Sequence, residues 1–204
     1  LRIMNCNYNI LNSMKVIETG RSTLNLIQAE PSIIKLLEKC DMYVEPLLES
    51  NLEIIVYGKK CVQRRNISFF SDKSMGYEYS NNIVKSKPLG EHLTPLIKFV
   101  NDKFGTHYNG ILVNKYGNGH DYIGAHSDSE KNLEIDTGVV CIATGYMRKF
   151  RIRGKVSKKI VCDLETSDFI QMSGDFQQEF THEIPKQLKV KESRISYTFR
   201  YHTK

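Results

Sequence analysis

The sequence lacks any apolar run near the roughly 20 residues that a membrane-spanning helix needs, so no transmembrane segment is predicted. It also lacks internal repeats, low-complexity tracts and linkers, and no secretory signal pattern follows its first residue. We therefore expect one compact soluble domain that works inside the cell, in the nucleus or cytoplasm, without a membrane partner. Because the chain begins with Leu1, we expect it to be part of a longer protein.

Closely spaced cysteine pairs are absent as well. The five cysteines are scattered, odd in number and without a Cys-x-x-Cys motif: Cys6, Cys40, Cys61, Cys141 and Cys162. This pattern favours a reducing compartment and argues against a structural zinc site. The formal net charge of +6 favours an anionic partner, although a solvated positive face is the common alternative.

Helical spacing dominates the first half of the chain. Residues 31–40 place three aliphatic side chains on one helical stripe, Ile33, Ile34 and Leu37. A second helix is predicted to start with Thr94 as its cap and Pro95 in its first turn, and to end at Gly105. The side chains that this helix turns inward are Leu96, Ile97, Val100 and Phe104.

Strand spacing dominates the second half. Six short candidate strands, separated by turn-rich segments, lie near residues 111–116, 138–144, 148–153, 159–164, 168–172 and 194–201. Many short strands in succession are typical of a β-sandwich or barrel. The sequence therefore predicts a mainly β fold with flanking α-helices, and periodicity leaves the type of β fold open.

His126, Asp128 and His182 are candidate metal ligands, because two imidazoles and one carboxylate form the facial ligand set of non-haem Fe(II) oxygenases. Residues two apart share one face of a strand, and a closed sandwich would deliver His182 from a distant strand. Zinc accepts the same ligand types. The structural alternative is a hydrogen-bonded loop pair with an unrelated core histidine.

The last candidate strand carries two cations on one face. Arg194, Ser196, Thr198 and Arg200 alternate along it, so they point to the same side. Two guanidinium groups there would hold a dicarboxylate, whereas the ordinary alternative is a solvated terminal strand.

Four segments resemble the AlkB family of Fe(II)- and 2-oxoglutarate-dependent dioxygenases in order and spacing: 114–116, 126–130, 174–185 and 194–200. Residues 56–59, Arg64 and residues 77–80 are more loosely similar to the branch that repairs alkylated duplex DNA. The resemblance implies a double-stranded β-helix, or jelly roll. It also implies oxidative demethylation of bases such as 1-methyladenine and 3-methylcytosine in DNA, coupled to conversion of 2-oxoglutarate and O2 to succinate and CO2, with release of formaldehyde.

The resemblance also implies roles for individual residues. The metal site would hold Fe(II). The 2-oxoglutarate site would comprise Asn114, Tyr116, Arg194, Thr198 and Arg200. The residues implied for the nucleic acid are Tyr57 as a wedge in the vacated stack, Arg64 on the backbone, Tyr77 and Tyr79 against the flipped base, and Glu130 at its exocyclic amino group.

A basic hairpin is predicted between residues 148 and 159, where seven cations, Arg153 and Lys155 among them, would grip phosphates. The alternative is an edge hairpin that its lysines keep soluble.

We expect three segments within one compact domain: an N-terminal extension with a helix (1–50), a nucleotide-recognition lid with a supporting helix (51–110), and the dioxygenase core (111–204, with its family match expected from residue 90). The expected partner is alkylated DNA, bound by a monomer. Two alternatives stay open: the same chemistry on RNA or protein, and a non-catalytic nucleic-acid-binding jelly roll.

Overall fold

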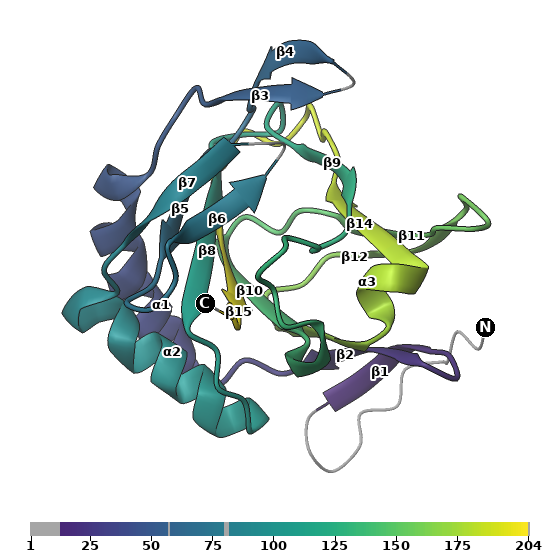
Figure 1. Cartoon of the computed structure of the whole chain (residues 1–204), viewed down its shortest axis with the longest axis horizontal. Helices are drawn as coiled ribbons and strands as arrows, with labels where there is room; N and C mark the ends of the chain where they lie inside the picture. The colour runs from purple at the N-terminus through teal and green to yellow at the C-terminus, as the bar shows by residue number, and fades with distance from the viewer. Residues whose placement is uncertain (1–12, 57, 80–81, 204) are drawn as a thin grey trace.

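The structure is a computed structural model that describes residues 13–56, 58–79 and 82–203 (Figure 1). Within that part of the chain no helix is long and apolar enough to cross a membrane. Its cysteines are free thiols, namely Cys40, Cys61, Cys141 and Cys162. Cys6 lies outside the described residues.

A large sheet of nine strands forms the body of the fold, in the order β1-β2-β13-β10-β15-β8-β5-β7-β6. Its strands are β1 Ser13–Glu18, β2 Ser22–Ile27, β5 Asn66–Phe70, β6 Gly76–Tyr79, β7 Asn82–Lys87, β8 Gly110–Tyr116, β10 Val139–Gly145, β13 Phe169–Gly174 and β15 Arg194–Arg200. The central strand β15 is buried at every residue. Both faces of the sheet are therefore covered at its centre.

A second sheet of four strands, in the order β12-β11-β14-β9, faces one side of the large sheet. Its strands are β9 Ile123–His126, β11 Phe150–Gly154, β12 Ile160–Leu164 and β14 Phe180–Ile184. Apolar side chains of both sheets, among them Val139 and Met172 of the large one and Ile152 and Ile184 of the small one, form a common core. The two sheets make the predicted jelly roll. A separate hairpin, β3 Glu53–Val56 with β4 Lys59–Val62, stands apart from them.

Two helices cover the other face of the large sheet (Figure 1). They are α1 Pro31–Val44 and α2 Gly90–Phe104, which pack against each other and against strands β8, β10 and β15. The shorter elements are the 3-10 turns η1 Glu45–Leu47 and η2 Ile135–Thr137, and α3 Phe176–Glu179. The prediction of a mainly β fold with flanking helices is confirmed.

The six predicted strands are confirmed, each end within two residues of its prediction. Two details of the helices were wrong. Ile34 is 45% exposed rather than part of the buried stripe. Helix α2 begins at Gly90 rather than after Thr94. It begins early because Leu89 and Leu93 are buried in the core and the N–H of Leu89 donates to Asp72 Oδ1 at 3.0 Å.

The strands of the large sheet come from all three of the segments expected from the sequence. The division at residues 50 and 110 stays a prediction.

Candidate active site

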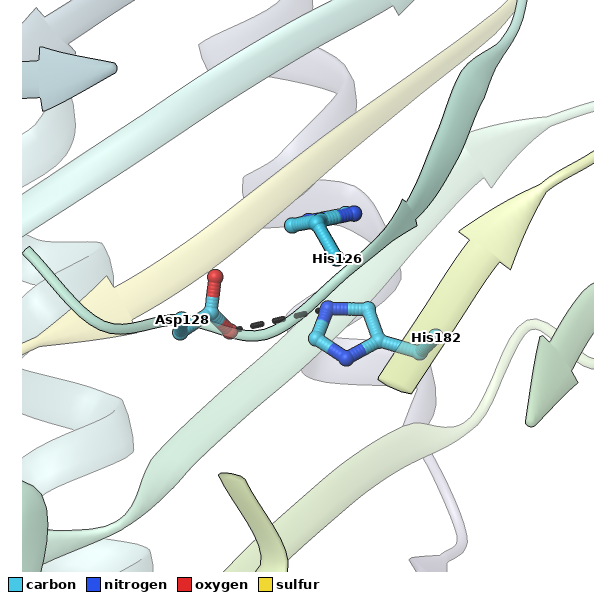
Figure 2. A group of neighbouring side chains, drawn as sticks. All are labelled: His126, Asp128 and His182. Carbon is cyan, nitrogen blue, oxygen red and sulfur yellow. Dashed lines mark ion pairs between the residues drawn. The ribbon is translucent and has the colours of Figure 1, made fainter. Parts of the chain in front are cut away.

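The three candidate ligands come together at one end of the small sheet (Figure 2). His126 is the last residue of β9, and it pairs directly with His182 of the neighbouring antiparallel strand β14. Asp128 follows two residues later. One ligand atom from each of the three residues lies within 4.8 Å of the others, and the two imidazole centroids are 4.4 Å apart. The sandwich thus brings His182 to two residues that lie 54 and 56 positions earlier in the chain.

The chemistry of this cluster fits a divalent cation. Asp128 is 2% exposed, and its Oδ2 faces His182 Nε2 at 3.6 Å. Among the described residues, that oxygen has no hydrogen-bond partner. A buried carboxylate oxygen without a donor is costly, and a cation shared with the imidazoles would satisfy it. This burial also argues against a surface loop pair.

Neighbouring groups orient the ligands. The carbonyl of Gly124 lies 2.9 Å from His126 Nδ1 and can only accept, so Nδ1 carries the proton and the lone pair of Nε2 is left for a metal. The ring of Phe150 stacks on His182, with centroids 5.1 Å apart. The N–H of Asp128 donates to Gln177 Oε1 at 2.9 Å.

The protonation states suit metal binding. Burial lowers the pKa of His126 to about 3, and the neighbouring His182 acts in the same direction. Burial likewise lowers the pKa of His182. For Asp128 burial alone would raise the pKa, but the Arg200 guanidinium and the nearby histidines outweigh it and lower the pKa to about 2. At neutral pH the cluster therefore offers two neutral imidazoles and one carboxylate.

Metal-free protein is expected to lose stability as the pH falls from about 6.5 toward 3. The histidines have folded-state pKa values below their ordinary value of 6.5, so in this range the unfolded chain binds protons that the folded chain does not. Protonation of Asp128 lowers the stability further at lower pH, between the ordinary pKa of 3.8 and the folded-state pKa of about 2.

Urea unfolding of chelator-treated protein between about pH 7 and pH 4 measures this dependence. The control His126→Asn, which cannot titrate, should show a shallower fall. A free energy of unfolding that stays constant over the range would contradict the buried neutral imidazoles.

The five residues predicted for 2-oxoglutarate line one cavity together with the three candidate ligands. They project from two paired strands, since Arg194 of β15 stands opposite Tyr116 of β8 and Ser196 stands opposite Asn114. The cavity together with the open space at its mouth has a volume of about 480 Å³. The prediction from strand alternation is thus confirmed for their placement on one face.

Arg194 and Arg200 differ in their partners. Arg194 is 4% exposed and lies over the Tyr116 ring at 5.6 Å, and among the described residues no carboxylate pairs with it. Arg200 is already paired, with Asp128 Oδ1 at 2.6 Å and with Glu130. A buried guanidinium without a carboxylate partner is suited to an anionic ligand, so Arg194 is the better candidate for that role.

Four residues were predicted to act on the flipped base or on the gap that it leaves, and the structure describes the side chains of two of them, Tyr77 and Glu130. Tyr77 is 3% exposed, lines the cavity and lies 4.9 Å from the Arg200 guanidinium carbon. Glu130 is also buried, but its carboxylate pairs with Arg200. Glu130 is not among the cavity-lining residues that the structure describes. Tyr57 and the Tyr79 side chain lie outside the described residues. The roles of all four stay predictions.

The sequence analysis assigned Arg64 to the nucleic acid and gave no role to its neighbour Arg65. Arg64 is exposed, whereas Arg65 is 4% exposed and its Nε donates to Asn114 Oδ1 at 2.7 Å. Counting back by two from the buried Ile67 of strand β5 would have placed Arg65 and Gln63 on the inward side. Arg64 as a backbone contact stays a prediction.

The basic hairpin is less cationic than its sequence indicates. Arg148 is 2% exposed and donates to four acceptors, Asn118 O, Asp121 O, Pro185 O and Gln187 Oε1. Arg151 is paired with Asp163, and Arg153 with Glu183. Lys155 donates to Gln177 O at 2.7 Å.

The prediction that seven cations of this hairpin contact phosphates is therefore wrong for Arg148, which is buried and has a structural role. Arg153 and Lys155 have intramolecular partners, and their contact with phosphates stays a prediction. Lys158 and Lys159 at the tip are exposed.

Comparisons with known proteins agree with this geometry. The chain is 26% identical over 210 residues to the DNA oxidative demethylase ALKBH2 of Bos taurus, covering 97% of this chain and 68% of that relative. It is 26% identical over 135 residues to the alpha-ketoglutarate-dependent dioxygenase alkB homolog 3 of Bos taurus, covering 61% of this chain and 47% of the relative. The solved structure of OsALKBH1 matches with a TM-score of 0.52 at 14% identity, covering 93% of this chain and 100% of that one, which shows a shared fold.

The family model of the 2OG-Fe(II) oxygenase superfamily matches residues 28–200. This match shows that the protein uses Fe(II) as its cofactor and 2-oxoglutarate and O2 as cosubstrates, and His126, Asp128 and His182 form a cluster that can hold the iron. The chain belongs to the 2OG-Fe(II) oxygenase superfamily, as an AlkB-like Fe(II)- and 2-oxoglutarate-dependent dioxygenase.

Proposed function

We propose that this protein demethylates N-alkylated bases in nucleic acid, and specifically 1-methyladenine and 3-methylcytosine in DNA. The observation that carries the proposal is one cavity that holds the His126, Asp128 and His182 cluster, the buried cation of Arg194 and the aromatic wall of Tyr77. The relatives named DNA oxidative demethylase support the choice of DNA.

In this proposal the three ligands would hold Fe(II), which when bound with 2-oxoglutarate and O2 would supply the chemistry for hydroxylating an N-methyl carbon, and the hydroxymethyl group would then be lost as formaldehyde. Arg194 would bind a carboxylate of 2-oxoglutarate by two parallel N–H donors. Asn114 and Tyr116 offer an amide and a hydroxyl on the same wall, and Thr198 a second hydroxyl. Arg65 fixes the Asn114 side chain by donating to its oxygen.

The base side of the cavity is formed by Tyr77 and Arg200. A base must leave the duplex stack to reach a buried metal, and an aromatic face such as Tyr77 holds it by stacking. Arg200 is held by Asp128 and Glu130, so it presents a fixed cation beside the Tyr77 ring. In this arrangement Glu130 acts on the base through Arg200.

One assay tests the function. Protein loaded anaerobically with Fe(II) and 2-oxoglutarate is exposed to air with methylated single-stranded DNA, duplex DNA or RNA, and formaldehyde is measured. Formaldehyde from methylated DNA and not from the unmethylated control is expected. Release from RNA alone would favour the RNA alternative, and no release from any substrate would favour a non-catalytic nucleic-acid-binding protein.

Duplex binding should depend on the exposed lysines at the hairpin tip. The double variant Lys158→Gln with Lys159→Gln is expected to flatten the slope of log affinity against log salt by about 0.9 for each phosphate that the protein no longer neutralises. Fluorescence anisotropy of a labelled duplex at several salt concentrations measures this slope. Arg153→Gln is the comparison, because Arg153 is paired with Glu183. An unchanged slope in the lysine variant would move the phosphate-binding cations away from the tip.

A further inference from the structure

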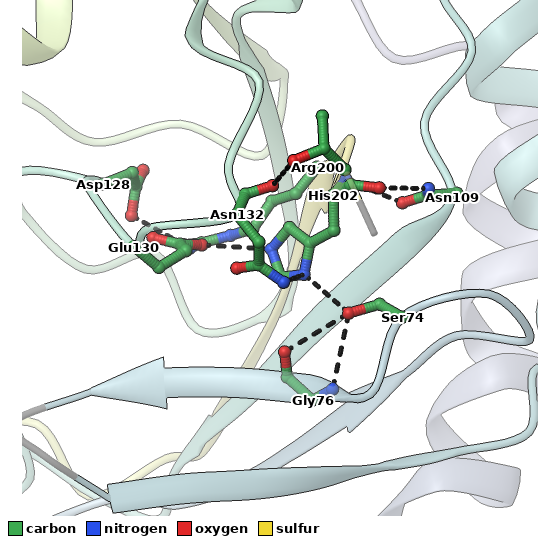
Figure 3. A network of polar contacts seen from close by, with 9 residues as sticks. Ser74, Gly76, Asn109, Asp128, Glu130, Asn132, Arg200 and His202 are labelled. Carbon is green, nitrogen blue, oxygen red and sulfur yellow. Dashed lines mark hydrogen bonds and ion pairs between the residues drawn. The ribbon is translucent and has the colours of Figure 1, made fainter.

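His202 lies two residues beyond strand β15, in a polar network with Glu130 and Arg200, with its side chain fully buried (Figure 3). Its Nε2 is 3.3 Å from Glu130 Oε1, and its Nδ1 is 2.9 Å from Ser74 Oγ. The ring stacks on Phe69 with centroids 4.9 Å apart. The imidazole therefore joins three separate segments of the chain.

The backbone at this position is also fixed. Asn109 accepts the N–H of His202 and donates to its carbonyl, both at 2.8 Å, so that one side chain holds both polar groups of the residue. With the ring stacked on one side and the backbone clamped, the imidazole has one available orientation.

The partners assign the ring proton. Glu130 is a carboxylate and accepts, so Nε2 must donate. The amide nitrogen of Asn132 lies 3.2 Å from Nδ1 and can only donate, and the hydroxyl of Ser74 can also donate, so Nδ1 must accept. The geometry points to the Nε2–H tautomer of His202.

From His202 two chains of contacts, the Nε2 arm and the Nδ1 arm, lead to the same place in the cavity. Through Nε2 the ring contacts Glu130, which pairs with Arg200, and Arg200 pairs in turn with the metal-site carboxylate Asp128. Through Nδ1 it contacts Ser74, whose hydroxyl also caps the turn at Gly76 where strand β6 starts. The next residue, Tyr77, lies over the Arg200 guanidinium.

We propose that His202 is a positioning residue that fixes the Glu130 carboxylate and the start of strand β6 relative to each other, so that Arg200 and Tyr77 keep their arrangement at the base side of the cavity. This rests on the proposed function only in assigning the base to the Tyr77 side. It leaves the metal ligands and Arg194 in place, because none of them contacts the imidazole in the described part of the chain.

The test compares variants that cut or keep each arm. His202→Ala removes both arms and Ser74→Ala removes the Nδ1 arm. His202→Gln keeps a donor for Glu130, and His202→Asn keeps an acceptor for Ser74. His107→Ala is the matched control, since His107 contacts the ring of the adjacent Tyr201 without reaching the site.

Three readouts separate positioning from general stability. In His202→Ala, amide hydrogen exchange over residues 74–78 and 128–133 should rise, and the KM for a methylated oligonucleotide should rise about tenfold, the value of one hydrogen bond to a charged group. The dissociation constants of Mn(II) and of 2-oxoglutarate should stay close to wild type. His202→Gln should restore protection at 128–133 and most of the KM, and His202→Asn protection at 74–78.

Ring nitrogen chemical shifts of labelled histidine are expected to show the proton on Nε2, and a proton on Nδ1 would overturn the assignment. Wild-type exchange and KM in His202→Ala, or equal changes in His107→Ala, would refute the positioning role. If His202→Ala does not fold, Ser74→Ala and His202→Gln carry the same test. If methylated DNA proves not to be a substrate, the exchange, Mn(II) and nitrogen readouts still decide the inference.

Discussion

Replacing His126, Asp128 or His182 with alanine is expected to abolish succinate formation from 2-oxoglutarate. Each residue supplies one of three ligand atoms that lie within 4.8 Å of one another, and removing one leaves the facial ligand set incomplete. Loss of groups that merely support a ligand costs about 10- to 100-fold in metal affinity, so loss of a ligand itself should cost at least that much.

Metal binding and folding of the variants are measured separately. Calorimetric titration with Mn(II) under anaerobic conditions should show binding to wild type and none to the three variants. His120→Ala is the control, because His120 is exposed and stands outside the cavity. His182 also packs on Phe150, so circular dichroism of the metal-free variants must show a folded chain. A folded His182→Ala protein that keeps wild-type Mn(II) affinity would remove His182 from the ligand set.

Arg194→Lys is expected to raise the KM for 2-oxoglutarate by at least about tenfold, with a smaller effect on kcat. Arg194 is buried against the Tyr116 ring, and its planar group offers a carboxylate two parallel donors. Lysine keeps the charge but replaces the two donors with one shorter-reaching ammonium. The Mn(II) affinity should stay unchanged, because Arg194 is not part of the ligand cluster.

Succinate formation at varied 2-oxoglutarate gives the KM, and Arg151→Lys is the matched control. Arg151 forms its ion pair with Asp163 away from the cavity, so its replacement should leave the 2-oxoglutarate KM at the wild-type value. An unchanged KM in Arg194→Lys would assign that carboxylate of 2-oxoglutarate to another residue of the cavity wall.

Local periodicity was sufficient to locate the strands that run through the centre of the large sheet. Strands β8 and β15 were located within one residue of their ends, and the shared face of Arg194, Ser196, Thr198 and Arg200 followed from alternation alone. Alternation is a property of the extended backbone, so it is written in the sequence whatever the strand pairs with.

Strands β9 and β14 were not located, although they carry two of the metal ligands. Each has only four or five residues, and their pairing contains an irregularity between His182 and Ile184. Strand β9 does not alternate between buried and exposed residues, and in β14 the polar His182 occupies a buried position between Phe180 and Ile184, so neither segment shows an apolar period in the sequence. The approach of His126 to His182 is therefore a product of the assembled sandwich.

The sequence by itself determined the ligand types, their order along the chain and the chemistry that such a set supports. Tertiary structure alone decided that Arg200 is held by Asp128 and Glu130, and that His202 contacts Glu130 from beyond the end of strand β15. It also decided that Arg148 is a buried brace rather than a phosphate contact. The physical reason is that a charge acquires its role from the groups that surround it after burial, and those groups come from distant parts of the chain.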